Sequence, residues 1–424
     1  MRLKEEKEVT KNSVDGILWN YVSIFILSIS GLLFNVIIMM FYDATILGIF
    51  NQSYSWYIVF SQVTVFGIQA SITKYAAEYK YDNDTLSKLF GSALLTVSVL
   101  AVGFSIAIEG ILYLIPNNKS DLIISIKIVV LALAFFSLNK FLLGFLNGLS
   151  LMKPYAVFQA LRYILIALSI CFLAIINAEG KNITVCFLIA EAILFLIIAV
   201  YLLIERVVKV KITKKWVLCH LNFGIRILPS NFVLELNTRA DVICLGLLLH
   251  DDYLIGIYSF AVLFAEGFYQ VFVVLRRSLN PVLTEKYINS ELITYWQDLK
   301  KRLSKIFHVL SIVGVIALLT GYYLLCRIMG KNEYLGGILP LGIIAGSIVI
   351  NAKSIVLGNL FSQTGKPWEE SCINLITVGC NILFNLMLIP FFGIIGAAIA
   401  TGFSYFAFST SLRIYAMKIL KLKA

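Results

Sequence analysis

The sequence predicts an all-α polytopic membrane protein with about twelve transmembrane helices, arranged as two six-helix lobes related by pseudo-twofold symmetry. Three observations predict this class. Of the 424 residues, 60% are hydrophobic and only 14% are charged, which is too little polar surface for a water-soluble fold of this length. The apolar segments are long enough to cross a bilayer core of roughly 30 Å as helices. Motifs from the first half also return in the second half, in the same order.

Twelve apolar runs are the candidate spans. Each is continuous, whereas a membrane β-barrel shows alternating segments of about ten residues, so helices are expected. The seventh run is unusually long and contains Pro229, which predicts a tilt or a break. The runs are 17–40, 50–72, 90–115, 122–145, 155–177, 184–204, 219–249, 254–275, 306–328, 337–360, 370–390 and 394–416.

The internal repeat predicts two domains, 1–208 and 209–424. Leu47-Gly48-Ile49-Phe50 returns as Ile255-Gly256-Ile257-Tyr258, and Leu143-Gly144 returns as Leu357-Gly358. The separations stay near roughly 210 residues, a constancy that unrelated matches would not keep. Six spans per repeat mean that both repeats enter the membrane from the same side. Such duplication of an apolar chain is typical of secondary transporters, where the substrate site lies between the repeats.

The formal net charge of +11 comes from basic residues in the predicted loops and does not indicate a nucleic-acid-binding surface. Lys and Arg gather in alternate loops, which the positive-inside rule assigns to the cytoplasm. Both termini are therefore expected to be cytoplasmic, and no nucleic-acid partner is expected. The basic groups include Lys74, Lys80 and Lys88, then Arg206 to Lys215, then Arg276, Arg277 and Lys286 to Lys305.

Motifs for enzymatic chemistry are missing. Gly365-Lys366 is followed by Pro367, so the phosphate-binding loop of ATPases is not formed. The seven cysteines and three histidines are scattered and have no metal-ligand spacing. The predicted loops are too short to hold a catalytic domain. A protein that is not an enzyme and carries no metal is expected.

Ionisable side chains inside a span are expected to have a structural or functional role, because each costs roughly 2.5–3.5 kcal/mol of insertion free energy at the bilayer centre. The seventh span carries Arg226, Glu235, Arg239 and Asp241. Glu235 and Arg239 have the spacing of an intrahelical ion pair, so mutual pairing accounts for those two without a ligand. A water-filled cavity along this span explains the whole set better.

Two further cations and one carboxylate lie in other spans. Arg162 and Lys353 are near the cytoplasmic boundary, where they either line the cavity or extend to lipid headgroups. Glu266 is the deepest lone carboxylate of the eighth span. Burial there would favour its protonated form and suit it to carrying a proton.

Amides and hydroxyls form a polar stripe in the second span. Ser55, Gln62, Gln69 and Thr73 share one face of a helix at their spacing. The stripe is either interhelical hydrogen bonding or a surface for sugar hydroxyls. Asn20 and Asn35 add polar groups from the first span.

Four groups of short motifs carry a family resemblance: Leu47-Gly48, Gly67-Ile68-Gln69 with Lys74-Tyr75, Asp241 with Ile255-Gly256-Ile257-Tyr258, and Gly393-Ile394-Ile395-Gly396-Ala397-Ala398-Ile399-Ala400. In these features the chain resembles the polysaccharide repeat-unit flippases, or O-antigen transporters, of the multidrug/oligosaccharidyl-lipid/polysaccharide exporter (MOP) superfamily. These motifs are short but extend over essentially the whole chain. The resemblance implies a MATE-like fold in the bacterial inner membrane. It implies transport of undecaprenyl-pyrophosphate-linked oligosaccharides to the outer leaflet for lipopolysaccharide or other surface-polysaccharide biosynthesis.

The resemblance also implies roles for the buried polar residues. The cations are expected to offset the pyrophosphate charge: Arg239 first, then Arg226, Arg162 and Lys353. Gln62, Gln69, Asn20 and Asn35 are expected to contact sugar. Asp241, Glu266 and Glu235 are expected to couple transport to a proton or sodium gradient, without any other cofactor. The expected partners are the lipid-linked glycan, membrane lipid, a polysaccharide polymerase and a chain-length regulator.

Other functions remain open at this point. A flippase for a lipid-linked peptidoglycan precursor has the same architecture and a similar cationic cavity. A cation-coupled multidrug antiporter would favour a cavity rich in carboxylates and aromatic rings. A membrane polymerase or ligase acting on the same glycan would need a larger outer loop than this sequence provides. Complementation of strains that lack each activity separates the four.

Overall fold

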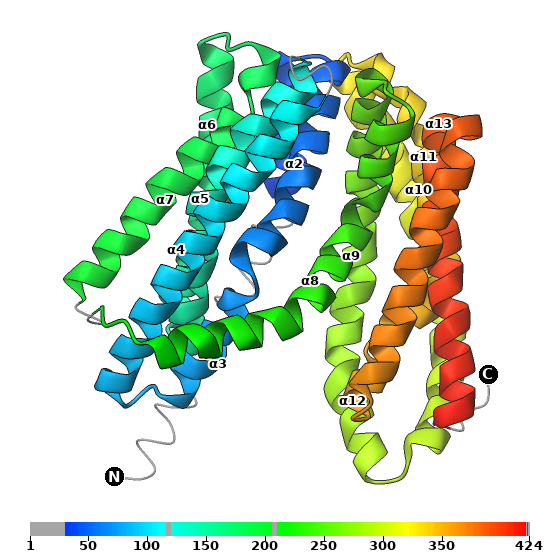
Figure 1. Cartoon of the computed structure of the whole chain (residues 1–424). Coiled ribbons are helices and arrows are strands. Elements are labelled where there is room, and N and C mark those ends of the chain that lie inside the picture. Colours follow the sequence, from blue (N-terminus) through cyan, green and yellow to red (C-terminus); the bar gives the residue numbers. More distant parts are fainter. Residues whose placement is uncertain (1–29, 116–119, 206–209, 421, 423–424) are drawn as a thin grey trace. The chain divides into compact units, whose positions relative to one another are not determined.

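The computed structural model describes residues 30–115, 120–205, 210–420 and 422, and the side chains of 296–310 are left aside. Every regular element in this part of the chain is a helix (Figure 1). Contacts between residues divide the chain into two compact units. The first unit holds the described residues up to Tyr42 and Gln52–Glu235, and the second holds Asp43–Asn51 and Leu236–Ala424.

The first unit contains most of seven helices. After a helical segment that includes Ser30–Phe41, they are α2 (Ala44–Val65), α3 (Ile68–Glu78), α4 (Asn83–Leu114), α5 (Asp121–Gly148), α6 (Met152–Ile175), α7 (Val185–Ile204) and the first part of α8 (Lys214–Leu248). A 3₁₀ turn, Gly180–Asn182, precedes α7. The first turns of α2 and the last part of α8 belong to the second unit.

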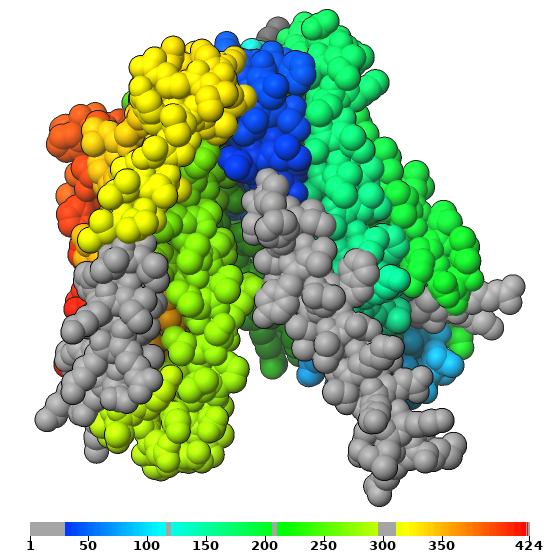
Figure 2. Space-filling model, turned by 180° about the vertical axis from the view of Figure 1, so that it is seen from behind, coloured from blue at the N-terminus to red at the C-terminus, as the bar shows by residue number. Residues whose placement is uncertain are grey.

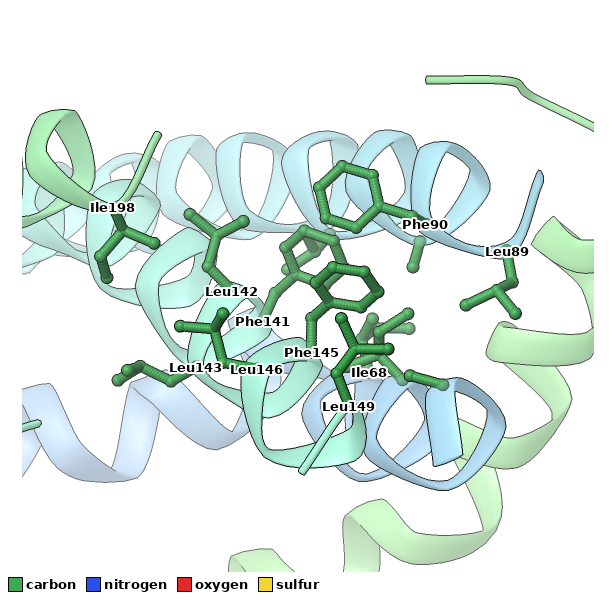
Figure 3. Packing of buried hydrophobic residues seen from close by; sticks show 14 of the residues in the cluster. Ile68, Leu89, Phe90, Phe141, Leu142, Leu143, Phe145, Leu146, Leu149 and Ile198 are labelled. Carbon is green, nitrogen blue, oxygen red and sulfur yellow. The ribbon is translucent and has the colours of Figure 1, made fainter. Parts of the chain in front are cut away.

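The core of the first unit is apolar and rich in aromatic rings. Phe90 of α4 packs against Phe141 and Phe145 of α5, with ring centroids 5.2 and 4.7 Å apart. Figure 3 shows Phe141 and Phe145 side by side below Phe90, with Ile68 and Leu149 near Phe145 and with Leu142 near Phe141. The same apolar residue types face the outside, because a bilayer solvates them as readily as a core does.

The connection before α8 is bound to α4. The backbone N–H groups of Lys211 and Thr213 donate to the Ser87 carbonyl (3.2 Å) and the Ser92 hydroxyl (2.9 Å). Lys211 also pairs with Asp84, with Nζ and Oδ1 2.6 Å apart. A Cβ on Gly91 would lie 2.3 Å from the Lys211 carbonyl oxygen, so glycine is needed where the connection crosses the helix. These contacts attach the start of α8 to the first unit, which continues to Glu235 and so extends past the sequence-repeat boundary at 208/209.

The N-terminus of α4 is capped by Asp82. Its carboxylate accepts hydrogen bonds from the backbone N–H groups of Asp84 (3.2 Å) and Thr85 (3.1 Å). Hydrogen bonds from Thr85 lower the pKa of Asp82, because they stabilise the ionised carboxylate. The cap fixes the short turn between the end of α3 and the start of α4.

The second unit contains the remaining helices. They are the last part of α8, α9 (Asp252–Ile288), α10 (Leu292–Ile328), the 3₁₀ segment Asn332–Gly337, α11 (Ile338–Val356), the short α12 (Leu360–Gln363) and α13 (Pro367–Ile419). Its core joins Leu283 of α9, Phe361 of α12, Ile373 and Leu412. Part of α9 is visible as yellow-green atoms in the space-filling view (Figure 2).

Helices α9 and α10 are longer than the sequence predicts. The expected basic loop over 276–305 was wrong, because only residues 289–291 separate the two helices. Ser290 has a positive φ of 59° there, and Lys286 pairs with Glu291 at 2.6 Å. Arg276 and Arg277 therefore belong to a helix and not to a loop.

The first turns of α2 and α9 pack against each other through two glycines. A Cβ on Gly48 would lie 1.9 Å from the Asp252 carbonyl oxygen, and a Cβ on Gly256 would lie 1.9 Å from the Ala44 carbonyl oxygen. The contact is reciprocal, with each glycine against the residue four positions before the other. The repeated motifs around Gly48 and Gly256 therefore meet in the second unit, which explains why the first turns of α2 are assigned to it.

Helix α13 contains two of the predicted spans. Gly393 interrupts it with φ 54° and ψ −131°, a conformation open essentially only to glycine. A Cβ on Gly396 would lie 2.4 Å from the Leu388 carbonyl oxygen, so the halves approach closely at this bend. Among the described residues, nine helices are long and apolar enough to cross a membrane, with α13 counted as one. The chain is thus a multi-pass membrane protein, and the count of twelve spans stays a prediction.

Candidate substrate-binding site

The break between α2 and α3 shapes the candidate site. Phe66 and Gly67 have positive φ values of 50° and 69°. A Cβ on Gly224 of α8 would lie 2.2 Å from the Phe66 carbonyl oxygen, and one on Gly67 would lie 2.4 Å from Cγ2 of Ile227. The two glycines therefore allow α8 to pass directly against the break.

The segment predicted as one span over 50–72 is therefore not one continuous helix, and the polar stripe is divided. Ser55 and Gln62 lie on α2, whereas Gln69 and Thr73 lie on α3. Hydropathy does not reveal such a break, because the flanking residues remain apolar. The one local signal is Gly67, and its positive φ shows only in three dimensions.

A pocket of 440 Å³ lies beside the break, inside the first unit. Its volume is typical of small-molecule sites in proteins. Polar side chains from α2, α3 and α8 surround it together with small apolar residues. The lining is Gln62, Val65, Gly67, Gln69, Ala70, Thr73, Lys74 and Asn231.

Neighbouring groups fix the polar side chains of the pocket. Gln62 is buried, and its Nε2 donates to the Ser61 hydroxyl at 3.1 Å. The Thr73 hydroxyl donates to the carbonyls of Gln69 (2.8 Å) and Gly144 (2.9 Å). A Cβ on Gly144 would lie 3.0 Å from Cγ of Gln69, so a glycine in α5 leaves room for the Gln69 side chain.

Lys74 is the charged member of the lining. Its side chain is exposed, and Nζ lies 4.6 Å from the ring centroid of Tyr75 and 5.7 Å from that of Phe223. Cation–π contacts of this kind hold an ammonium group without neutralising it. The pocket therefore combines amide groups, a hydroxyl and one positive charge.

Sequence reasoning missed Lys74 and Asn231 as site residues. Charge counting assigns Lys74 to a cytoplasmic loop, because it follows an apolar run and belongs to a basic group. Its position directly after the Gln62–Thr73 stripe was the available signal. For Asn231 the sequence suggests only a partner for the backbone groups that Pro229 frees.

Arg162 lies elsewhere, in a buried ion pair of the first unit. Its Nε is 2.6 Å from Oε1 of Glu191. The same carboxylate accepts from the Tyr57 hydroxyl (3.1 Å) and from Nδ2 of Asn139 (2.8 Å). The Arg162 guanidinium also stacks on Phe136 at 4.6 Å from the ring centroid. The structure thus gives the Arg162 charge an internal partner, and Arg162 does not line the 440 Å³ pocket.

The second unit holds a separate cluster of the predicted ion-coupling residues. Asp241 is buried, and its carboxylate accepts from the Tyr258 hydroxyl and from the Val242 N–H, both at 2.8 Å. Arg239 and Asp241 both lie close enough to Glu266 to interact with it electrostatically. The structure therefore brings Arg239, Asp241 and Glu266 together around the parts of α8 and α9 that belong to this unit.

The remaining predicted residues are dispersed. Arg226 is exposed on α8, and Lys353 is half-buried on α11. Glu235 is half-buried and interacts electrostatically with Lys140. Asn35 is buried and donates to the Gly31 carbonyl at 2.8 Å. Asn20 lies outside the described residues.

No group of His, Cys, Asp or Glu side chains suited to a metal ion occurs in the part of the chain that the structure describes. The seven cysteines are all free thiols. The chemistry that the site offers is hydrogen bonding and charge.

Comparisons with known proteins give one matching family model and a similar sequence. The family model described as "Polysaccharide biosynthesis protein" matches residues 13–285. The membrane protein MJ1068 of Methanocaldococcus jannaschii is 25% identical, and the match covers 93% of this chain and 82% of that protein.

Solved structures share the fold at low identity. The lipid II flippase MurJ, in an inward closed conformation, superposes with a TM-score of 0.74 at 16% identity, over 95% of this chain and 88% of MurJ. The multidrug transporter DinF-BH, of the MATE type, gives a TM-score of 0.63 at 14% identity, over 96% and 95% of the two chains. A MOP-superfamily transporter from Pyrococcus furiosus gives 0.56 at 12% identity, over 96% of each chain.

Proposed function

The chain belongs to the polysaccharide biosynthesis protein family and has the fold of MOP-superfamily transporters, and from this premise we propose that it moves undecaprenyl-pyrophosphate-linked oligosaccharide repeat units across the cytoplasmic membrane by alternating access. The cargo is an O-antigen unit or a related surface-polysaccharide unit. Transport runs from the cytoplasmic to the outer leaflet, and a polymerase with its chain-length regulator uses the product there.

The observation that carries the proposal is the composition of the 440 Å³ pocket. Sugar hydroxyls both donate and accept hydrogen bonds, and the carboxamides of Gln62, Gln69 and Asn231 do the same. The ammonium group of Lys74 matches the negative charge of a pyrophosphate. An antiporter for organic cations would place a carboxylate here, and none occurs among the described residues that line the pocket.

The second cluster is the proposed coupling site. The hydrogen bonds described above bring neutral donors to the Asp241 carboxylate, namely the Tyr258 hydroxyl and a backbone N–H. Ionisable side chains buried in a membrane protein are costly and mark proton or ion pathways, so Asp241 is the proposed exchanging group. Arg239 interacts electrostatically with Asp241, and both residues interact electrostatically with Glu266.

The test uses the purified full chain in proteoliposomes with a fluorescently labelled, undecaprenyl-pyrophosphate-linked oligosaccharide. The accessibility of the label to a membrane-impermeant quencher measures transport between leaflets. Lys74→Gln should lower the initial rate by about tenfold or more, as expected when a charge-assisted contact worth about 1.5–3 kcal/mol is lost. Lys215→Gln removes the same charge from an exposed position on α8 that does not line the pocket, and it should leave the rate unchanged.

Two further cargoes separate the rival functions. Lipid II tests the peptidoglycan-precursor alternative, and a fluorescent organic cation tests the antiporter alternative. Transport of either one, without transport of the lipid-linked oligosaccharide, would replace the proposal. Equal rates for Lys74→Gln and Lys215→Gln would remove the pocket from the mechanism.

A further inference from the structure

The second unit contains a pair of buried polar atoms that no described contact satisfies. Nε of Arg276 and Oδ1 of Asn280 are both buried and have no hydrogen-bond partner among the described residues. The two residues are one helical turn apart on α9 and therefore share a face. A buried donor or acceptor without a partner is unfavourable unless a ligand or water completes its hydrogen bonding. The Arg276 side chain also hydrogen-bonds the Tyr269 side chain, which leaves its Nε for another partner.

A glycine makes room for Arg276. A Cβ on Gly358 would lie 2.7 Å from Nη1 of Arg276 and 3.4 Å from its Cδ. Any larger residue at position 358 would displace the guanidinium. Gly358 follows α11 in the short turn before α12, so the guanidinium lies against backbone from a different part of the second unit.

A glycine also makes room for two polar side chains that line the pocket of the first unit. Leu143-Gly144 and Leu357-Gly358 are equivalent in the sequence repeat, and Gly144 gives room to Gln69 and Thr73. Asn280 and Thr284 of α9 repeat the amide–threonine spacing of Gln69 and Thr73 on α3.

Both threonines also make equivalent hydrogen bonds. The Thr73 hydroxyl donates to the carbonyl of Gln69, and the Thr284 hydroxyl donates to that of Asn280 (3.2 Å). Thr284 also donates to Oε1 of Gln363 at 2.7 Å, which fixes the end of the polar row. Asn280 and Thr284 are thus the sequence counterparts of Gln69 and Thr73, and Arg276 lies one helical turn before Asn280 on α9.

We propose that Arg276 and Asn280, in the space left by Gly358, form a second polar subsite that binds a phosphate group. The guanidinium offers several donors in a planar fork, which suits phosphate oxygens. The Asn280 carboxamide oxygen accepts from a hydroxyl of the same ligand. The proposal rests on the proposed function for the source of the phosphate, which is either the lipid-linked cargo or an anionic phospholipid.

Native mass spectrometry of the detergent-purified full chain tests this subsite. The probes are undecaprenyl pyrophosphate and phosphatidylglycerol, with phosphatidylethanolamine as the competing lipid. Arg276→Gln should weaken retention of at least one probe by about tenfold, a change of about 1.4 kcal/mol. Gly358→Ala should weaken the same probe, because its Cβ takes the place of Nη1.

Arg277→Gln is the matched control, since Arg277 is the exposed neighbour on the same helix and the charge change is identical. It should change retention less than twofold. Loss of undecaprenyl pyrophosphate alone identifies the cargo as the source, and loss of phosphatidylglycerol identifies membrane lipid; either supports the subsite. Equal retention of both probes by Arg276→Gln, Arg277→Gln and the parent protein overturns it.

The outcome is independent of the transport assay. A chain that carries no lipid-linked oligosaccharide, but loses phosphate binding in Arg276→Gln, would contradict the proposed function and keep the subsite. Thermal unfolding of each variant in the same detergent separates lost binding from lost fold. Arg276→Lys restores the charge without the planar fork, so it should recover only part of the retention.

Discussion

The buried pair of Arg162 and Glu191 gives the sharpest test of how the first unit is held together. Glu191→Gln keeps the side-chain volume but removes the charge that faces Nε of Arg162 at 2.6 Å. Both partners are almost inaccessible, with side-chain exposures of 9% and 0%. Removing one partner of such a pair costs about 3–5 kcal/mol, because the other charge stays buried and uncompensated. For a unit of this size, that corresponds to a fall in Tm of roughly 6–20 °C.

The assay is thermal unfolding of the detergent-solubilised protein, followed by size-exclusion chromatography with fluorescence detection. Glu285→Gln makes the same chemical change at an exposed position of α9 and should leave Tm within about 1 °C, as surface substitutions usually do. The double variant Arg162→Met/Glu191→Gln should regain at least half of the loss, because it removes the stranded guanidinium. Tyr57 donates to Oε1 of Glu191 and Asn139 donates to Oε2, so the single carboxamide oxygen of Glu191→Gln keeps one of these two hydrogen bonds.

Two results would refute this reasoning. One is a Tm for Glu191→Gln equal to that of the parent protein, and the other is a double variant that melts below both single variants. The double variant also tests whether Arg162 contacts the cargo or only stabilises the fold. If Arg162 served the cargo directly, the double variant would be folded but inactive, whereas an internal ion pair predicts that transport survives.

Three further predictions concern backbone and hydroxyl contacts, each read from the same unfolding assay. Gly48→Ala should destabilise the protein by about 1–3 kcal/mol, because its Cβ would overlap the Asp252 carbonyl. Gly103→Ala is the control: its Cβ has open space, and the substitution should stabilise α4 by roughly 0.5–1 kcal/mol. A Gly48→Ala protein more stable than Gly103→Ala would contradict the packing. Tyr258→Phe removes the 2.8 Å hydrogen bond to Asp241 and should cost about 0.6–1.7 kcal/mol, and an unchanged Tm would mean that this bond contributes nothing. Gly393→Ala should cost about 1–3 kcal/mol, because its φ of 54° with ψ of −131° strains any other residue, and tolerance of alanine would show that the bend relaxes.

The candidate site was only partly predictable from the sequence. Gln62 and Gln69 were identified from their spacing, and the structure places both in the lining of one pocket. The spacing argument assumed a continuous helix, whereas the pocket exists because the helix breaks at Gly67. Lys74 escaped the prediction because charge counting assigns every lysine after an apolar run to a loop. The distinction needs the positions of Tyr75 and Phe223, which hold its ammonium group.

The membrane-embedded all-helical class, the duplicated motifs and the boundary between the last two spans near Gly393 follow from the sequence alone. Hydropathy and glycine act locally, so a short window of residues decides where a helix lies and where it must stop. The partners of buried charges were decided only by tertiary structure. Arg162 meets Glu191, 29 residues further along the chain, and Gly358 admits the guanidinium of Arg276 from another helix. A charge in a low-dielectric interior is stabilised by whatever packs within a few ångströms of it, and packing joins residues that no local window contains.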